Sequence, residues 1–262
     1  MTRPMSATYT LGNTWAKARR RVMLIEQMLD PATTARLRDL GVGPGFRCLE
    51  VGAGAGSISR WLCEQVGPSG SVTAVDLEPT LLLEDPHPAL EIVQSDVTRD
   101  PLPGDGYDLV HARALLMHLP NREELIGGML DRLRPGGVIL LEEADFYPMA
   151  TAQSAAYAEV FTVRVPRVAA SHGGDWMWAR HLPARLAAAG AIDVSAGTAV
   201  QNFHSGTPMA EFLTLSLEQL TPLLEADGAE DSLIAAATAV MNQPTQWLPS
   251  FAMVTASGRR PG

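Results

Sequence analysis

The stretch FRCLEVGAGAG at residues 46–56 decides the fold. Its first six residues have the apolar character of a buried strand, and a turn with three glycines follows directly. Glycine tolerates positive φ angles and lets a ligand approach the backbone closely. Residues 57–66 then show a helical pattern whose N-terminus points at the same turn. The stretch therefore predicts a strand that ends in a ligand-binding turn.

The alternation of strand and helix continues along the chain. We expect further strands at 71–76, 90–94, 107–111 and 138–142, with helices at 79–83 and 121–133. Strands that alternate with helices in this way indicate right-handed βαβ units and a parallel sheet.

The flanking segments lack this alternation. Residues 14–40 have a helical pattern that we expect to break into two helices near Pro31. After the fifth strand come helical stretches at 151–170, 176–189, 208–225 and 231–241, and strands at 193–200 and 251–256.

Composition excludes several classes of protein. The 262 residues carry a net charge of −9, so no large basic surface for nucleic acid is expected. Two cysteines do not make a disulfide scaffold. No run approaches the 18 apolar residues of a membrane span. We expect a soluble cytoplasmic protein that binds neither nucleic acid nor membranes.

The glycine turn also resembles a nicotinamide-binding fingerprint, and two residues argue against that alternative. Ser57 stands where the fingerprint requires glycine or alanine. Glu50, two residues before the first glycine, would repel a pyrophosphate but suits an ammonium or sulfonium group. A generic tight turn between strand and helix remains the other alternative.

Two acidic positions follow at the ends of the next strands. Asp76 ends the second strand, where its carboxylate can accept both hydroxyls of a ribose. Asp96 and Val97 follow the third strand and offer an acceptor for an exocyclic amine and an apolar wall for a purine. The alternatives are a turn residue or helix cap for Asp76 and an Asx-turn for Asp96.

In this order the motifs resemble those of class I S-adenosylmethionine-dependent methyltransferases of the small-molecule type. The stretch EVGAG at 50–54 resembles the first motif of that family, and Asp76 resembles its ribose-binding acid. Asp96-Val97 resembles the adenine-side motif, and LRPGGV at 133–138 the turn before the fifth strand. The run HARALLMHLP at 111–120 is similar to a loop in a subgroup common in actinobacterial metabolism.

The resemblance implies a fold and a cofactor. The fold is a Rossmann-like, seven-stranded, mostly parallel sheet with helices on both faces and an antiparallel last strand. The cofactor is S-adenosylmethionine, and the product is S-adenosylhomocysteine. The cofactor-binding residues it implies are Glu50, Gly52, Ala53, Gly54, Ser57, Asp76, Leu77, Asp96, Val97, His111 and Arg113.

The absence of two motifs limits the classes of methyl acceptor that the resemblance allows. The Asn/Asp-Pro-Pro-aromatic motif of enzymes that methylate amides and bases is missing after the fourth strand. Arg113 stands where metal-dependent catechol-type enzymes would need acidic residues, so no metal is expected. The resemblance therefore implies methyl transfer to a small molecule, in secondary metabolism, and leaves O-, N- and C-methylation open.

The catalytic base and the acceptor pocket are less clearly marked. His172 is the first candidate for a base and His204 the second. His111 and His118 lie seven residues apart, but without an acidic partner they do not indicate a metal site. Alignment against the sulfonium already lowers the barrier to methyl transfer, so a strong base is not essential. Candidate aromatic residues for the pocket, which could equally be core, are Tyr9, Trp15, Phe146, Tyr147 and Trp176.

We divide the chain into residues 1–45, an arm with helices that forms part of a lid, and residues 46–262, the methyltransferase domain. A helical insertion at 147–180, between strands five and six, completes the lid. The sequence leaves a homodimer open. It also leaves open a protein of the same fold that no longer methylates, either a cyclase or a cofactor-binding accessory protein.

Overall fold

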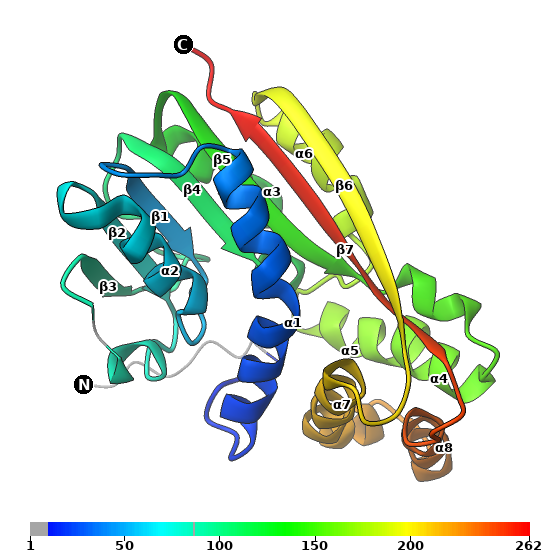
Figure 1. Ribbon diagram of the computed structural model, residues 1–262. Helices are drawn as coiled ribbons and strands as arrows, with labels where there is room; N and C mark the ends of the chain where they lie inside the picture. The colour runs from blue at the N-terminus through cyan, green and yellow to red at the C-terminus, as the bar shows by residue number, and fades with distance from the viewer. Residues whose placement is uncertain (1–9, 86) are drawn as a thin grey trace.

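The computed structural model describes residues 10–85 and 87–262 and has a seven-stranded sheet at its centre (Figure 1). The strand order is β3-β2-β1-β4-β5-β7-β6. Strand β7 pairs antiparallel with β5 and β6, while the pairs among β1 to β5 are parallel. The strands are β1 (Arg47–Val51), β2 (Ser71–Asp76), β3 (Leu90–Gln94), β4 (Tyr107–Arg113), β5 (Leu133–Asp145), β6 (Ile192–Phe203) and β7 (Leu248–Arg259). The predicted fold class is confirmed.

Helices cover both faces of this sheet. Successive residues of a strand point to opposite faces, so Cys48 and Leu49 of β1 mark the two sides. Cys48 shares an apolar cluster with helices α1 (Ala18–Asp39) and α2 (Ser57–Val66). Leu49 shares a different cluster with α3 (Arg122–Arg132) and α6 (Leu182–Ala188).

A second helical body lies beyond the carboxyl end of β5, beside the long β6–β7 pair (Figure 1). It comprises α4 (Ala155–Glu159), a π-helical turn (Val160–Arg164), α5 (Val165–Ser171), α7 (Pro208–Ala226) and α8 (Asp231–Met241). Its apolar core includes Tyr157, Phe161 and Leu217 and continues onto Phe146 and Phe251 at the ends of β5 and β7. Within the described ranges, no helix is long and apolar enough to span a membrane.

The expected break of the first helix is wrong, because α1 continues through Pro31. A proline inside a helix costs about 3 kcal/mol, since it removes a hydrogen bond and crowds the preceding turn. Leu24, before the proline, packs into the core of the second helical body, and Leu37, after it, packs on the sheet. Burial on both sides of Pro31 offsets that cost and keeps the helix in one piece.

Two other helices are shorter than the pattern predicts. The helix expected at 79–83 is only a 3₁₀ turn at Leu82–Glu84. The helix expected from Trp176 begins with a 3₁₀ turn at Ala179–His181. The Trp176 carbonyl accepts the Phe146 amide at 3.0 Å, which ties that segment to the end of β5 instead.

Candidate functional site

A cleft opens at the carboxyl ends of β1, β2 and β4, between the sheet and helices α1 and α7. One half is polar and includes Glu26, Glu50, Asp76 and Asp96. The other half is largely apolar and is lined by Leu11, Arg21, Val22, Ile25, Met117, His118, Ala144, Phe146, Phe161, Trp176, Phe212, Leu213, Ser216, Leu220 and Phe251. Ligands of open α/β sheets bind at this edge, so we treat the cleft as the candidate active site.

The glycine turn shapes the polar half. Gly52, Gly54 and Gly56 have φ angles of 78°, 61° and 86°, which side-chain-bearing residues rarely adopt. A Cβ atom at Gly52 would lie 3.0 Å from Leu115, and one at Gly56 would lie 2.1 Å from a Leu82 methyl. The turn therefore requires glycine for both backbone conformation and space.

Asp76 supports this turn from the end of β2. Its Oδ2 accepts the Gly54 amide and its Oδ1 accepts the Glu78 amide, each at 2.8 Å. Burial raises the pKa of Asp76, although the two amide hydrogen bonds oppose that rise. Each carboxylate oxygen can accept a further hydrogen bond, so Asp76 can serve the turn and two ligand hydroxyls together.

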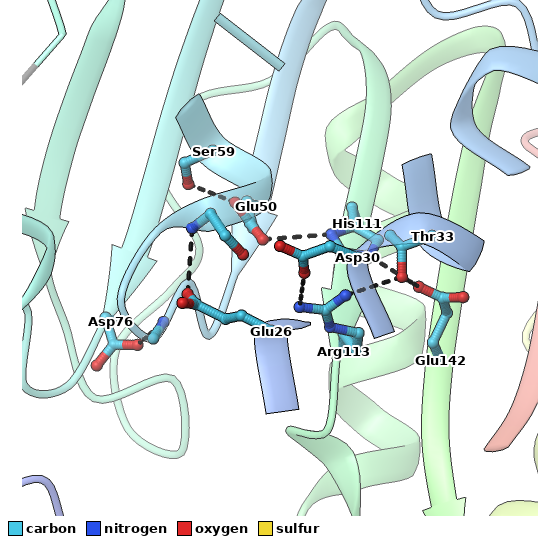
Figure 2. A network of polar contacts seen from close by, with 11 residues as sticks. Glu26, Asp30, Thr33, Glu50, Ser59, Asp76, His111, Arg113 and Glu142 are labelled. Carbon is cyan, nitrogen blue, oxygen red and sulfur yellow. Dashed lines mark hydrogen bonds and ion pairs between the residues drawn. The ribbon is translucent and has the colours of Figure 1, made fainter. Parts of the chain in front are cut away.

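Glu50, His111 and Glu142 form a row of buried side chains on neighbouring strands (Figure 2). His111 Nδ1 lies 3.4 Å from Glu50 Oε1, and its Nε2 lies 3.5 Å from Glu142 Oε2. Burial lowers the pKa of His111, but the two carboxylates outweigh it and hold this pKa above its ordinary value. Burial likewise raises the pKa of Glu142, and His111 outweighs this and lowers it. The row therefore places an imidazole between two carboxylates, and the pairing of His111 with Glu142 favours the charged form of both.

The row continues to helix α1 (Figure 2). The Thr33 hydroxyl donates to Glu142 at 2.6 Å, and Arg113 donates to Thr33 at 2.9 Å and to Asp30 at 2.7 Å. These bonds hold the middle of α1, including the turn around Pro31, against the sheet.

Asp96 has mainly a local role. Its Oδ1 accepts both the amide and the hydroxyl of Thr98, at 3.0 and 2.6 Å, which is the Asx-turn that the sequence left open. The residue still lines the cleft beside Val97.

Comparisons with known proteins agree with this geometry. Residues 49–141 match the family described as "Methyltransferase domain". The ubiquinone/menaquinone biosynthesis C-methyltransferase UbiE of Ectopseudomonas mendocina (strain ymp) is 32% identical over 111 residues, which are 39% of this chain and 43% of that protein. The chain thus spans less than half the length of this relative.

Two solved structures share the fold. An S-adenosylmethionine-dependent methyltransferase from Mesorhizobium loti aligns with a TM-score of 0.53 and 20% identity over 90% of this chain and 100% of its own. The [4+2]-cyclase SpnF aligns with a TM-score of 0.51 and 18% identity over 90% of this chain and 82% of its own.

Residues 49–141 therefore carry a methyltransferase domain, and the chain shares its fold with an S-adenosylmethionine-dependent methyltransferase. The polar half of the methyltransferase cleft fits the charge of that cofactor. Glu26, Glu50, Asp76 and Asp96 line it, and its one arginine, Arg113, already pairs with Asp30. Such a set attracts a sulfonium and an ammonium group and repels a pyrophosphate. The glycine turn leaves the backbone open to close approach.

Phe146 and Trp176 line the apolar half, and their contact with an acceptor stays a prediction. Their ring centroids lie 5.0 Å apart, and Phe146 stacks on Phe251 at 5.7 Å. Both side chains are almost fully buried, so they belong to the core and wall the methyltransferase cleft at the same time.

Of the other three aromatic candidates, Trp15 and Tyr147 are not among the described residues that line the cleft. Tyr9 lies outside the described residues. Trp15 is half-buried beneath the ammonium of Lys17, and Tyr147 is exposed beneath Arg180.

The structure also leaves both candidate bases away from the cleft lining. His172 contacts the Val168 carbonyl through Nδ1 at 2.9 Å, and the His204 ring packs on Trp247. His111, predicted to bind the cofactor, is fully buried behind Glu50 and supports that residue instead. The remaining predicted cofactor residues, Glu50, Gly52, Ala53, Gly54, Ser57, Asp76, Leu77, Asp96, Val97 and Arg113, all line the cleft.

His118 is the histidine that reaches the apolar half. Burial, with the nearby charges of Arg21 and Arg122, lowers the pKa of His118 to about 3. The side chain is therefore neutral at pH 7 and a weak base.

Glu143 shapes the loop that carries His118. It accepts the amides of Leu115, Leu116 and Met117 at 3.0, 2.8 and 3.1 Å. Burial raises the pKa of Glu143 to about 7 despite these bonds.

The sequence did not predict two residues of α1 that line the cleft. Glu26 accepts the Ser57 amide at the start of α2 at 3.3 Å, and Arg21 is buried in the apolar half. The helical spacing could have indicated that Arg21 is buried, since it lies three residues from both Ala18 and Leu24 on one buried stripe of the helix.

Proposed function

We propose that this protein transfers a methyl group from S-adenosylmethionine to an apolar small molecule and releases S-adenosylhomocysteine. The observation that carries the proposal is one cleft with two halves, an acidic half at the glycine turn and an apolar half beside it. S-adenosylmethionine supplies an electrophilic methyl on its sulfonium.

The residues of the polar half take distinct roles in this proposal. Asp76 accepts the ribose hydroxyls, and Glu50 attracts the ammonium group of the cofactor. Leu77 and Val97 line the cleft near these acids and pack on the adenine ring. His111 positions Glu50 from behind.

Residues 1–45 and 147–180 form the cover of the cleft in this proposal, over the domain at 46–262. Leu11, Asn13 and Arg21 line it from the first segment, and Phe161 and Trp176 line it from the second. A cover that excludes water keeps the acceptor aligned with the sulfonium. Helix α7 also contributes, through Phe212, Leu213 and Ser216, so the cover extends beyond the predicted insertion.

The acceptor class follows from the apolar half, which suits a ring-sized hydrophobic metabolite. The relative from Ectopseudomonas mendocina is named for quinone biosynthesis, which supports an apolar acceptor. A place in secondary metabolism completes the proposal and rests on the resemblance of the 111–120 loop.

A non-methylating role is the second candidate. The [4+2]-cyclase shares the fold over 90% of this chain, so the fold alone does not separate the two activities. The neutral, weakly basic His118 at the apolar half is compatible with either.

Calorimetric titration with S-adenosylmethionine, S-adenosylhomocysteine and NADH tests the cofactor. We expect the first two to bind and NADH to bind weakly or not at all; tighter binding of NADH would falsify the proposal. Incubation of the protein and S-adenosylmethionine with a panel of apolar acceptors, read by mass spectrometry, tests the transfer. Cofactor binding with no methylated product across the panel would favour the second candidate.

A further inference from the structure

Arg21 is a buried arginine with an incomplete set of partners. The residue is 4% exposed and lines the apolar half of the cleft. Its Nη2 donates to the Leu11 carbonyl at 2.7 Å, and its Nε is buried without a hydrogen-bond partner. Within residues 10–85 and 87–262, no carboxylate lies within ion-pair distance of it. A buried charge without a counter-charge is costly, so this arrangement calls for an anion.

The two preceding arginines show what an ordinary surface position in α1 looks like. Arg19 pairs with Glu84, and Arg20 pairs with Glu211 at 2.6 Å. Both side chains are more than half exposed. Arg21 differs because it points into the stripe of α1 that faces the cleft.

Several uncharged polar groups line the same cleft as Arg21. Trp176 Nε1 is a second buried donor without a partner. The Ser216 hydroxyl is already bonded to the Phe212 carbonyl at 2.7 Å, and His118 is neutral. Asn13 has a buried side-chain oxygen without a partner, and its amide can present either end. Among the described residues, the acids that line the cleft are Glu26, Glu50, Asp76 and Asp96; Glu26 is the one nearest to Arg21 along the chain, and it accepts the Ser57 amide.

From these groups we infer that the acceptor carries an oxygen anion, a carboxylate, phenolate or enolate, on an apolar ring-sized body, and that Arg21 binds this anion. The inference rests on the proposed function and names the substrate class of the same cleft. It concerns recognition and leaves the methylated atom open. The apolar walls bind the body of the acceptor, while Arg21 and the Trp176 indole supply donors to the oxygen.

The alternative is a purely structural Arg21 that only tethers Leu11 to α1. That role uses Nη2 alone and needs no charge, so a neutral donor would serve it equally well. It leaves the buried Nε and the missing counter-charge unexplained. The two roles differ in one measurable property, the preference of the cleft for an anionic over a neutral ligand.

The test compares 2-naphthoate with its neutral counterpart 2-naphthamide, titrated calorimetrically at pH 7.5 with S-adenosylhomocysteine at saturation. Charge-assisted hydrogen bonds are strong, so wild-type protein should bind the naphthoate at least about tenfold more tightly. Arg21→Met should abolish this preference. Arg21→Gln keeps a donor for the Leu11 carbonyl and should abolish it as well. The matched control Arg20→Met, which removes an exposed cation one residue away, should retain it.

The outcomes separate the inference from the function on which it rests. Failure of S-adenosylhomocysteine to bind the wild-type protein overturns the proposed function. If it binds, but the naphthoate binds no more tightly than the amide, the inference is overturned and the proposed function stands. An anion preference that survives Arg21→Gln also overturns the inference. Should Arg21→Met fail to fold, Arg21→Gln alone decides.

Discussion

His111 holds two buried carboxylates together, and its removal gives the sharpest test of the polar row. In His111→Phe a planar ring is kept, while Glu50 and Glu142 remain buried without the imidazole between them. Breaking a buried ion pair by removing one partner costs about 3–5 kcal/mol. Ser59 still donates to Glu50 and Thr33 to Glu142, so we expect the lower end, about 3 kcal/mol.

The expected effect on melting is large enough to measure. A loss of 1 kcal/mol lowers Tm by about 2–4 °C in a chain of roughly this length, so Tm should fall by about 6–12 °C. Differential scanning calorimetry at pH 6 measures it directly. His172→Phe is the matched control, because His172 touches no member of the row and its loss should shift Tm far less. Adding Glu142→Gln to His111→Phe removes one uncompensated charge and should restore part of the loss.

The pH dependence of this effect has a definite sign. The pKa of His111 is raised on folding, so its contribution is complete below its ordinary pKa of about 6.5 and is lost as pH rises through the raised value. The pKa of Glu142 is lowered, so its contribution is complete above about 4.5 and is lost as pH falls through the lowered value. The difference between wild type and His111→Phe should therefore be greatest between about pH 4.5 and 6.5. An unchanged Tm at pH 6, or a difference that grows at alkaline pH, would refute the reasoning.

Three further predictions concern the cleft and its cover. Asp76→Ala should weaken the binding of S-adenosylhomocysteine at least about tenfold in calorimetric titration, because each lost charge-assisted hydrogen bond is worth about 1.5–3 kcal/mol. It should also lower the Tm of the ligand-free protein, since the Gly54 and Glu78 amides lose their acceptor. Unchanged affinity would show that Asp76 is a turn residue only. In Glu143→Gln, the free energy of unfolding should change less with pH between about pH 4.5 and 7 than in the wild type. The pKa of Glu143 is raised to about 7, so its contribution to wild-type stability is lost as pH rises through that value. A wild-type stability that rises over this range relative to the variant would contradict the prediction. Deletion of residues 1–13 should reduce turnover sharply, because it removes Leu11 and Asn13 from the cleft wall. It should also lower the ligand-free Tm, because Leu11 is buried and its carbonyl accepts from Arg21. Intact turnover, or complete unfolding, would show that the arm is no lid.

Local signals were enough to predict the elements that build the sheet. Strands β2 and β3 and helix α2 begin and end where the sequence predicts them. Helix α2 is a clear case, since Gly56 precedes it with a left-handed backbone and Gly67-Pro68 ends it. The acids at the strand ends could be found for the same reason, because a strand that enters a turn places its last side chain at the edge of a parallel sheet.

Local sequence signals could not predict contacts between segments that are distant along the chain. Pro31 predicts a break, but burial of Leu24 and Leu37 against two different cores keeps α1 continuous. The partners of His111 lie 61 and 31 residues away along the chain, and neither spacing marks a pair. A histidine among apolar strand residues gives no hint of two carboxylates on the neighbouring strands.

The two halves of the cleft come from different parts of the chain, and this division bears on what a family match can establish. Most of the acidic half, including Glu50, Asp76 and Asp96, falls within residues 49–141, which match the methyltransferase domain. Much of the apolar half, including Arg21, Trp176 and Phe212, falls outside that range. The family therefore accounts for the cofactor but carries little information about the acceptor.

The two halves of the cleft, one proposed for the cofactor and one for the acceptor, also differ in charge. Carboxylates face the space proposed for the cationic cofactor, while the one charged side chain lining the apolar half is the cation Arg21, in the part of the chain that the structure describes. In the proposed function, an acceptor anion bound by Arg21 shares one cleft with the sulfonium of the cofactor, and opposite charges attract. This attraction would bring acceptor and cofactor together without a basic side chain, which is consistent with a neutral His118 and with His172 and His204 lying away from the cleft lining.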